Sequence, residues 1–90
     1  MRRRLIVTGR VQGVWYRGWT VDQARALGLD GWVRNRRDGR VEMLVSGPDE
    51  AVGELIRRCH AGPPAARVEG VAVEESEEPV PAGFDQRPTV

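Results

Sequence analysis

Six short segments, joined by glycine or proline at nearly every junction, most constrain what this chain can fold into. Four are short apolar runs typical of strands, and two carry apolar residues at helical spacing. Their order is strand, helix, strand, strand, helix, strand. With 90 residues, the chain forms a single domain over residues 1–90, and its two helices cannot cover both faces of a four-stranded sheet.

This order predicts an α+β fold, the ferredoxin-like β-α-β-β-α-β sandwich, with both helices on one face of an antiparallel sheet. Right-handed crossovers place the first and third strands side by side in the middle. The predicted strands are Arg3 to Gly9, Asp30 to Asn35, Arg40 to Gly47 and Ala66 to Glu74. The Asp-Gly pair between the second and third strands predicts a tight hairpin turn.

The two predicted helices have recognisable ends. The first runs from Tyr16 to Leu27, and Gly28 stands at its C-terminal cap. The second begins at Pro48, which suits the first helical position, and it stops before Gly62. A buried stripe at helical spacing is expected on the second helix. Its members are Val52, Leu55, Ile56 and Cys59.

The last segment has no clear periodicity. Residues 78–90 are acidic at their start and contain proline, which predicts a loop. A short edge strand around Phe84 is the alternative. No stretch approaches the roughly 20 apolar residues of a membrane span, so we expect no membrane association. The single cysteine, Cys59, cannot form an intramolecular disulfide and favours a reducing compartment, the cytoplasm.

Charge is unevenly distributed along a chain whose net charge is only +1. Residues 1–40 hold ten arginines against three aspartates, a net of +7, and residues 41–90 hold four arginines against ten acids, a net of −6. The first half can therefore present a positive face to an anionic partner. The alternative is that the two halves interleave in the fold and cancel.

The segment from Gly9 to Arg17, "GRVQGVWYR", joins the first strand to the first helix. Glycines let such a loop curl so that successive backbone N–H groups point inward at a helix N-terminus, which favours binding of an anion. Arg17 adds a fork of donors that suits a phosphate. The segment lacks the Gly-Lys-Ser/Thr ending of a nucleotide P-loop, and it contains no serine, cysteine or histidine.

Two long motifs, "GRVQGVWYR" and "GLDGWVRNRRDGRVE", together with "SGP" and "GPPAARVEGV", resemble the acylphosphatase family over about Arg4 to Val73. The resemblance implies the ferredoxin-like fold. It also implies hydrolysis of the carboxyl-phosphate bond of small acyl phosphates to a carboxylate and inorganic phosphate, without a metal or cofactor. We therefore expect an acyl phosphate and phosphate as ligands. A monomer is expected because the domain shows no long apolar surface stripe, and no nucleic acid is expected as a partner.

By position, the resemblance implies roles for the residues of the first motif and for Asn35 in the second motif. Backbone N–H groups of the loop would cradle the phosphoryl group, Arg17 would clamp it, and Asn35 would orient the attacking water. The residues assigned to phosphate binding are Gly9, Arg10, Val11, Gln12, Gly13, Val14, Trp15, Tyr16 and Arg17. Two positions depart from the family's pattern. Tyr16 stands where Phe is usual, and Gln86 stands where an aliphatic residue is usual, which puts the final edge strand in question.

From the residues alone, other interpretations remain open. Arg17 could pair with Asp22 on the surface, and Asn35 could be a turn residue before the hairpin. Three tryptophans, at positions 15, 19 and 32, are expected to pack in the core or at its rim. An RNA-binding module is disfavoured because the first and third strands contain no aromatic residue. A noncatalytic phosphate sensor is the third functional class.

Overall fold

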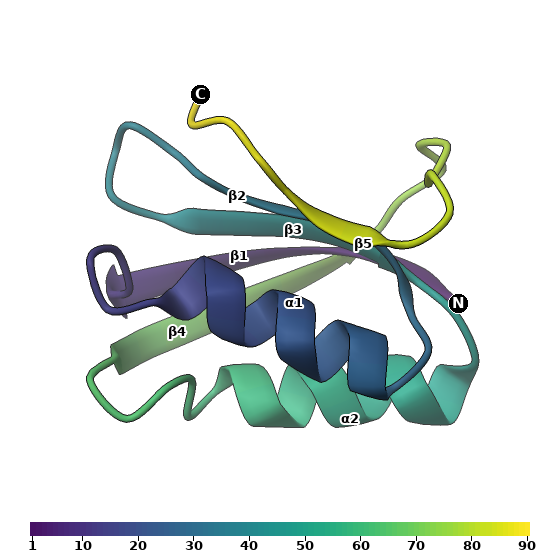
Figure 1. Ribbon diagram of the computed structural model, residues 1–90, viewed down its shortest axis with the longest axis horizontal. Helices are drawn as coiled ribbons and strands as arrows, with labels where there is room; N and C mark the ends of the chain where they lie inside the picture. Colours follow the sequence, from purple (N-terminus) through teal and green to yellow (C-terminus); the bar gives the residue numbers. More distant parts are fainter.

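The computed structural model describes residues 1–90 and arranges them in two layers. The elements are β1 Arg2–Arg10, α1 Tyr16–Ala26, β2 Asp30–Asn35, β3 Val41–Ser46, α2 Asp49–Cys59, β4 Arg67–Glu75 and β5 Phe84–Arg87. Both helices lie on the same face of one sheet (Figure 1). The predicted ferredoxin-like α+β fold is thereby confirmed. Neither helix is both long and apolar enough to cross a membrane.

The strand order across the sheet is β4-β1-β3-β2-β5, so the predicted central pair of β1 and β3 is confirmed. The first four strands pair antiparallel, but β5 pairs parallel with β2. The predicted antiparallel pairing is therefore confirmed for these four strands, and the fifth strand makes the sheet mixed. The start of β5 is held beside the start of β2, because the Gly83 N–H donates to Asp30 Oδ1 at 2.9 Å and the Gly31 N–H donates to the Gly83 carbonyl at 2.8 Å.

The core lies between the sheet and the two helices. Alternating residues of the central strands, such as Leu5 and Val7 of β1, are fully buried there. The predicted stripe of α2 is confirmed. Val52, Leu55 and Cys59 are fully buried, and Ile56 packs partly against the core. This packing fixes both helices on the sheet and with them the N-terminus of α1.

The opposite face of the sheet carries charge. Glu42 of β3 is only 3% exposed and accepts hydrogen bonds from Arg34 Nε at 2.7 Å and Arg36 Nη1 at 2.9 Å. Arg4 also donates to this carboxylate and further pairs with Glu78. Acids from the second half of the chain therefore neutralise arginines from the first half. Of the two interpretations of the charge asymmetry, interleaving is the one that holds on this face.

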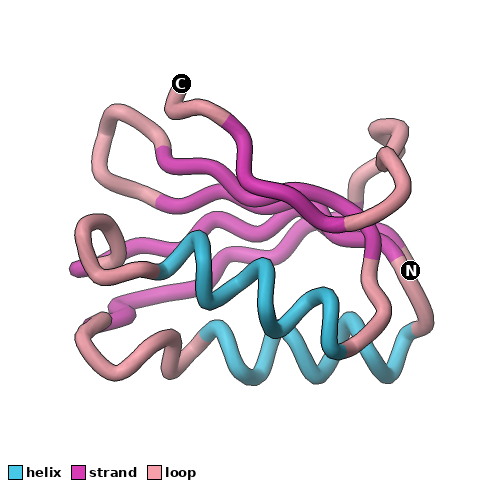
Figure 2. The backbone as a smooth tube through the Cα atoms, viewed as in Figure 1, coloured by secondary structure: helices cyan, strands magenta, loops and turns pink.

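Three connections gather at one end of the molecule. In Figure 2 the loop between β1 and α1, the hairpin between β2 and β3, and the connection from α2 to β4 lie at the same end. The predicted hairpin is present: the Arg36 N–H donates to the Arg40 carbonyl at 2.8 Å, and Gly39 takes a positive φ of 98°. The fold thus places the β1–α1 loop next to the end of β2.

Candidate active site

The loop between β1 and α1 is tightly curled. Gly13 has a φ of 73°, and Trp15, which immediately precedes α1, has a φ of 67° and a ψ of 25°. Both values lie in the left-handed region, which a residue with a side chain rarely adopts. Alternation of left- and right-handed residues turns successive N–H groups toward one side of the chain. The left-handed residues Gly13 and Trp15, two positions apart, give the loop the kind of turn on which anion-binding nests depend.

The backbone N–H groups of this loop are not used inside the protein. No backbone or side-chain acceptor of the chain takes a hydrogen bond from any N–H between Val11 and Gly18. The first chain-internal donor of the helix is Trp19, whose N–H bonds to the Trp15 carbonyl at 3.0 Å. Backbone donors in folded proteins are nearly always paired, so an unpaired run at the positive end of a helix favours an anionic acceptor.

Side chains from both flanks hold the loop in place. Gln12 Nε2 donates to the carbonyls of Arg36 at 2.6 Å and Arg40 at 2.9 Å, which ties the loop to the β2–β3 hairpin. The Tyr16 hydroxyl donates to the Cys59 carbonyl at 2.7 Å, which ties the start of α1 to the end of α2. Burial raises the pKa of the Tyr16 phenol well above its ordinary value, so this donor stays protonated. The loop is therefore a braced structure.

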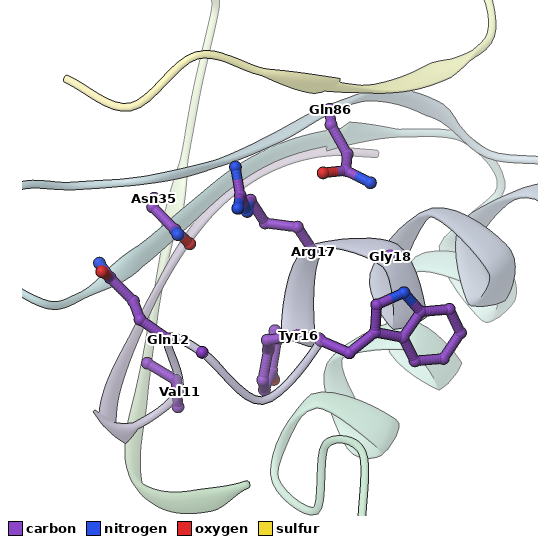
Figure 3. A pocket seen from close by; sticks show the side chains of 9 residues that line it. Val11, Gln12, Tyr16, Arg17, Gly18, Asn35 and Gln86 are labelled. Atoms are coloured by element: carbon purple, nitrogen blue, oxygen red, sulfur yellow. The ribbon is translucent and has the colours of Figure 1, made fainter. Parts of the chain in front are cut away.

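A pocket of about 110 Å³ opens above the loop. Its lining residues are Val11, Gln12, Gly13, Trp15, Tyr16, Arg17, Gly18, Asn35 and Gln86. Arg17 comes from the first turn of α1 and Asn35 from the last residue of β2, and Figure 3 shows their side chains directed toward each other. The fold thus brings together the two residues that the sequence analysis assigned to catalysis.

Three of the assigned phosphate-binding residues do not line the pocket. They are Gly9, Arg10 and Val14. Gly9 instead lies against β4 at a register shift of the β1–β4 pairing, where a β-carbon would stand 2.2 Å from the Arg67 carbonyl oxygen. Its glycine is therefore required by the close approach of two backbones.

The side chains of Arg17 and Asn35 have no partner within the protein. Neither Arg17 nor Asp22 takes part in any ion pair, so the alternative of a surface pair between them is wrong. The Asn35 carbonyl accepts from the Val90 N–H at 3.2 Å, but its side-chain amide makes no hydrogen bond that would stabilise the turn. Both polar groups are therefore available to a ligand.

Two pocket residues, Gly18 and Gln86, were not predicted. Gln86 belongs to β5, which forms in spite of the polar residue, and its side chain lies beside Arg17 in Figure 3. The final edge strand that this departure put in question is therefore present, and Gln86 also contributes to the pocket lining. Phe84, buried two residues earlier, places Gln86 on the helix side because side chains alternate along a strand.

The sequence profile of the acylphosphatase family matches residues 3–86. The chain belongs to the acylphosphatase family. It is 57% identical over 88 residues to the acylphosphatase of Rhizorhabdus wittichii, an alignment that covers 98% of this chain and 89% of that one. Acylphosphatases are hydrolases that act on acid anhydrides, so the predicted enzyme class and the resemblance from the sequence are both confirmed.

Solved acylphosphatase structures have the same fold. The acylphosphatase of Bacillus subtilis superimposes with a TM-score of 0.90 at 38% identity and covers 96% of this chain and 97% of its own. The acylphosphatase of Coxiella burnetii gives a TM-score of 0.91 at 34% identity and covers 96% of this chain and 90% of its own. This chain therefore has the same fold as these acylphosphatases along nearly its whole length.

The hydroxyl of Tyr16 gives a test of how the loop is braced. In the Tyr16→Phe variant the ring remains, but the Cys59 carbonyl loses its donor in a buried setting. We expect the free energy of unfolding to fall by about 1–2 kcal/mol, the usual cost of a buried polar group left unpaired. Urea unfolding at neutral pH measures this change, with an unaltered dependence on denaturant. An unchanged midpoint would contradict this role.

Proposed function

We propose that this protein hydrolyses acyl phosphates by the direct attack of water on phosphorus. The bond between phosphorus and the bridging oxygen breaks, and the carboxylate leaves with the bonding electron pair. The new bond joins the water oxygen to phosphorus, and a phosphoryl oxygen of the substrate takes the water's proton. No residue has to act as a nucleophile or general base, because phosphoryl transfer needs positioning and charge stabilisation above all.

The unpaired N–H groups from Val11 to Gly18 carry this proposal. They form a run of donors at the N-terminus of α1, where the helix dipole is positive. The guanidinium of Arg17, free of any acid partner, supplies two further parallel donors for the phosphoryl oxygens. A dianionic phosphoryl group matches the positive charge that these donors present.

We assign to Asn35 the role of positioning the attacking water. Its side-chain amide has both a donor and an acceptor, so it can fix a water oxygen while leaving a lone pair directed at phosphorus. The position of Asn35 across the pocket from Arg17 supports this assignment (Figure 3). An asparagine amide is neutral at all working pH values, and it therefore does not repel the phosphoryl group as a carboxylate would.

Replacement of Asn35 separates water positioning from phosphate binding. For Asn35→Ala we expect kcat for benzoyl phosphate to fall about 100-fold or more, the effect of removing one preorganised polar group from a reacting centre. The inhibition constant of inorganic phosphate should change little, because the cradle and Arg17 remain. Steady-state hydrolysis in excess EDTA, with phosphate as a competitive inhibitor, measures both quantities.

A second variant at the same position gives the matched comparison. Asn35→Asp keeps the shape but places a carboxylate beside the phosphoryl group, and it should weaken phosphate binding as well as turnover. If Asn35→Ala retains wild-type kcat, the water-positioning role is wrong. If the wild-type protein binds phosphate without turning over benzoyl phosphate, the noncatalytic sensor is the correct function.

The proposal extends to the protein's setting. We infer a monomer in the cytoplasm that acts without a metal or cofactor and binds no nucleic acid. The single buried cysteine, Cys59, supports a reducing compartment. Burial raises the pKa of its thiol to about 12, so it is not a reactive thiolate. The central strands β1 and β3 lack the aromatic residues on which RNA bases stack. Activity in EDTA tests the absence of a metal requirement.

A further inference from the structure

One large apolar side chain at the pocket is exposed. The side chain of Trp15 is 63% exposed, whereas Trp32 is 3% exposed and Trp19 packs partly against the core. The expectation that the tryptophans serve core or rim packing thus holds for the other two and is wrong for Trp15. Trp15 also lines the pocket, and aromatic side chains are common in the lining of ligand-binding sites.

The local structure holds this indole against the helix. A β-carbon on Gly18 would stand 2.1 Å from Trp15 Nε1 and 2.5 Å from its Cε2, so the ring lies over a position that only glycine leaves free. Glycine is unfavourable inside a helix, and a left-handed φ is unfavourable for tryptophan. Both unfavourable features, the helical Gly18 and the left-handed Trp15, lie next to each other in this fold. Their shared consequence is one indole laid flat on the first turn of α1.

The direction of the reaction places the acyl group on this side of the pocket. In an in-line displacement, the attacking and leaving oxygens lie at opposite ends of one axis through phosphorus. Under the proposed function the water lies at Asn35. Figure 3 shows Gly18 and Gln86 on the far side of the Arg17 side chain from Asn35. The leaving carboxylate and its substituent therefore depart toward Gly18, Gln86 and the indole that covers Gly18.

We propose that the indole of Trp15 is the binding surface for the acyl group, and that it makes the enzyme selective for acyl phosphates with an aromatic or extended apolar substituent. This inference rests on the proposed function, since it takes the position of the acyl group from the site of water attack. A planar acyl group stacks on an indole face, whereas an acetyl group is too small to cover it. Trp15 is thus a specificity-determining residue through its ring, separate from the contribution of its backbone N–H.

The test compares two substrates in each variant. The quantity measured is the ratio of kcat/KM for benzoyl phosphate to kcat/KM for acetyl phosphate. Damage to the phosphate cradle lowers both values together and cancels in this ratio. Trp15→Gly removes the ring and permits the left-handed φ, and Gly18→Ala displaces the ring without removing it. We expect the ratio to fall about 5- to 10-fold in both variants, the size of an aromatic stacking preference. Trp15→Phe, which keeps an aromatic face, should retain most of the ratio.

Binding measurements separate this inference from the proposed function. Phenylphosphonate and methylphosphonate carry the same anionic group and differ only in the substituent. Titration calorimetry of both should show a preference for phenylphosphonate that Trp15→Gly and Gly18→Ala reduce, even if the wild type hydrolyses neither substrate. A preference that is absent in the wild type, or unchanged in Trp15→Gly, overturns the inference. Failure of hydrolysis with the preference intact overturns the proposed function alone.

Discussion

The Arg17→Ala variant is expected to lose at least about 1,000-fold in kcat/KM for benzoyl phosphate, the effect seen when an arginine that stabilises a transferring phosphoryl group is removed. Arg17 is the only arginine that lines the pocket, and no acid of the protein neutralises it. Its charge is half-buried at the positive end of α1. In the Arg17→Ala variant, the negative charge that develops on the phosphoryl oxygens would therefore lack the only full positive charge at the pocket.

Two further arginine variants sharpen this prediction. Arg17→Lys keeps the charge but loses the planar fork, so it should recover part of the phosphate binding and little of the turnover. Arg37→Ala removes an exposed arginine of the β2–β3 hairpin that lies outside the pocket, and it should leave both unchanged. Steady-state kinetics and inhibition by inorganic phosphate measure the three variants. Turnover of Arg17→Ala within tenfold of the wild type would exclude the clamp.

Glu42→Gln is expected to lower the free energy of unfolding by about 3 kcal/mol at neutral pH, because breaking a buried ion pair leaves its partners uncompensated. The carboxylate is 3% exposed and lies among the guanidinium groups of Arg4, Arg34 and Arg36. An amide keeps the shape of the side chain but not the charge, so three arginines are left close together. Urea unfolding measures the loss.

The same cluster gives a pH dependence with a definite sign. Burial alone would raise the pKa of Glu42, but the hydrogen bonds from Arg34 and Arg36 and the nearby positive charges outweigh it and hold the pKa below its ordinary value of 4.5. A carboxylate whose pKa is lowered by folding stabilises the protein above its unfolded-state pKa. The difference in stability between the wild type and Glu42→Gln should therefore be constant at neutral pH, and shrink as the pH falls below about 4.5.

Glu54 provides the matched control. It also accepts hydrogen bonds from two arginines, Arg57 and Arg58, but the pairs lie on the exposed surface of α2. Solvent screens such pairs, so Glu54→Gln should change the free energy of unfolding by less than about 1 kcal/mol. Equal losses in the two variants would show that burial of the Glu42 cluster does not matter.

Much of the architecture could be predicted because it depends on local patterns. The Asp-Gly turn fixes the hairpin, and helical spacing from Val52 to Cys59 identifies the face that packs on the sheet. The loop "GRVQGVWYR" could be predicted to bind an anion because two glycines and a following arginine lie within one short segment. The assignment of Asn35, in contrast, depended on the family resemblance, since an asparagine before a hairpin is common.

Other features depend on which distant segments meet. Gln86 reaches the pocket because the start of β5 is held beside the start of β2, a pairing between segments more than fifty residues apart. Glu42 finds Arg4 through the neighbouring position of β1 and β3. The sequence around Gln86 or Glu42 does not predict these contacts. Alternation along a strand predicts which face of the sheet a side chain lies on, but it does not predict which strands become neighbours.

The order of the elements and the curled conformation of the β1–α1 loop were therefore contained in the sequence, since backbone conformation and amphipathic spacing act over a few residues. Tertiary packing determined the direction of the last strand and the presence of Gln86 at the pocket. It also determined the exposed position of the Trp15 indole over Gly18. Such packing depends on the burial and hydrogen bonding of all segments of the chain together, so a pattern within one short segment does not predict it.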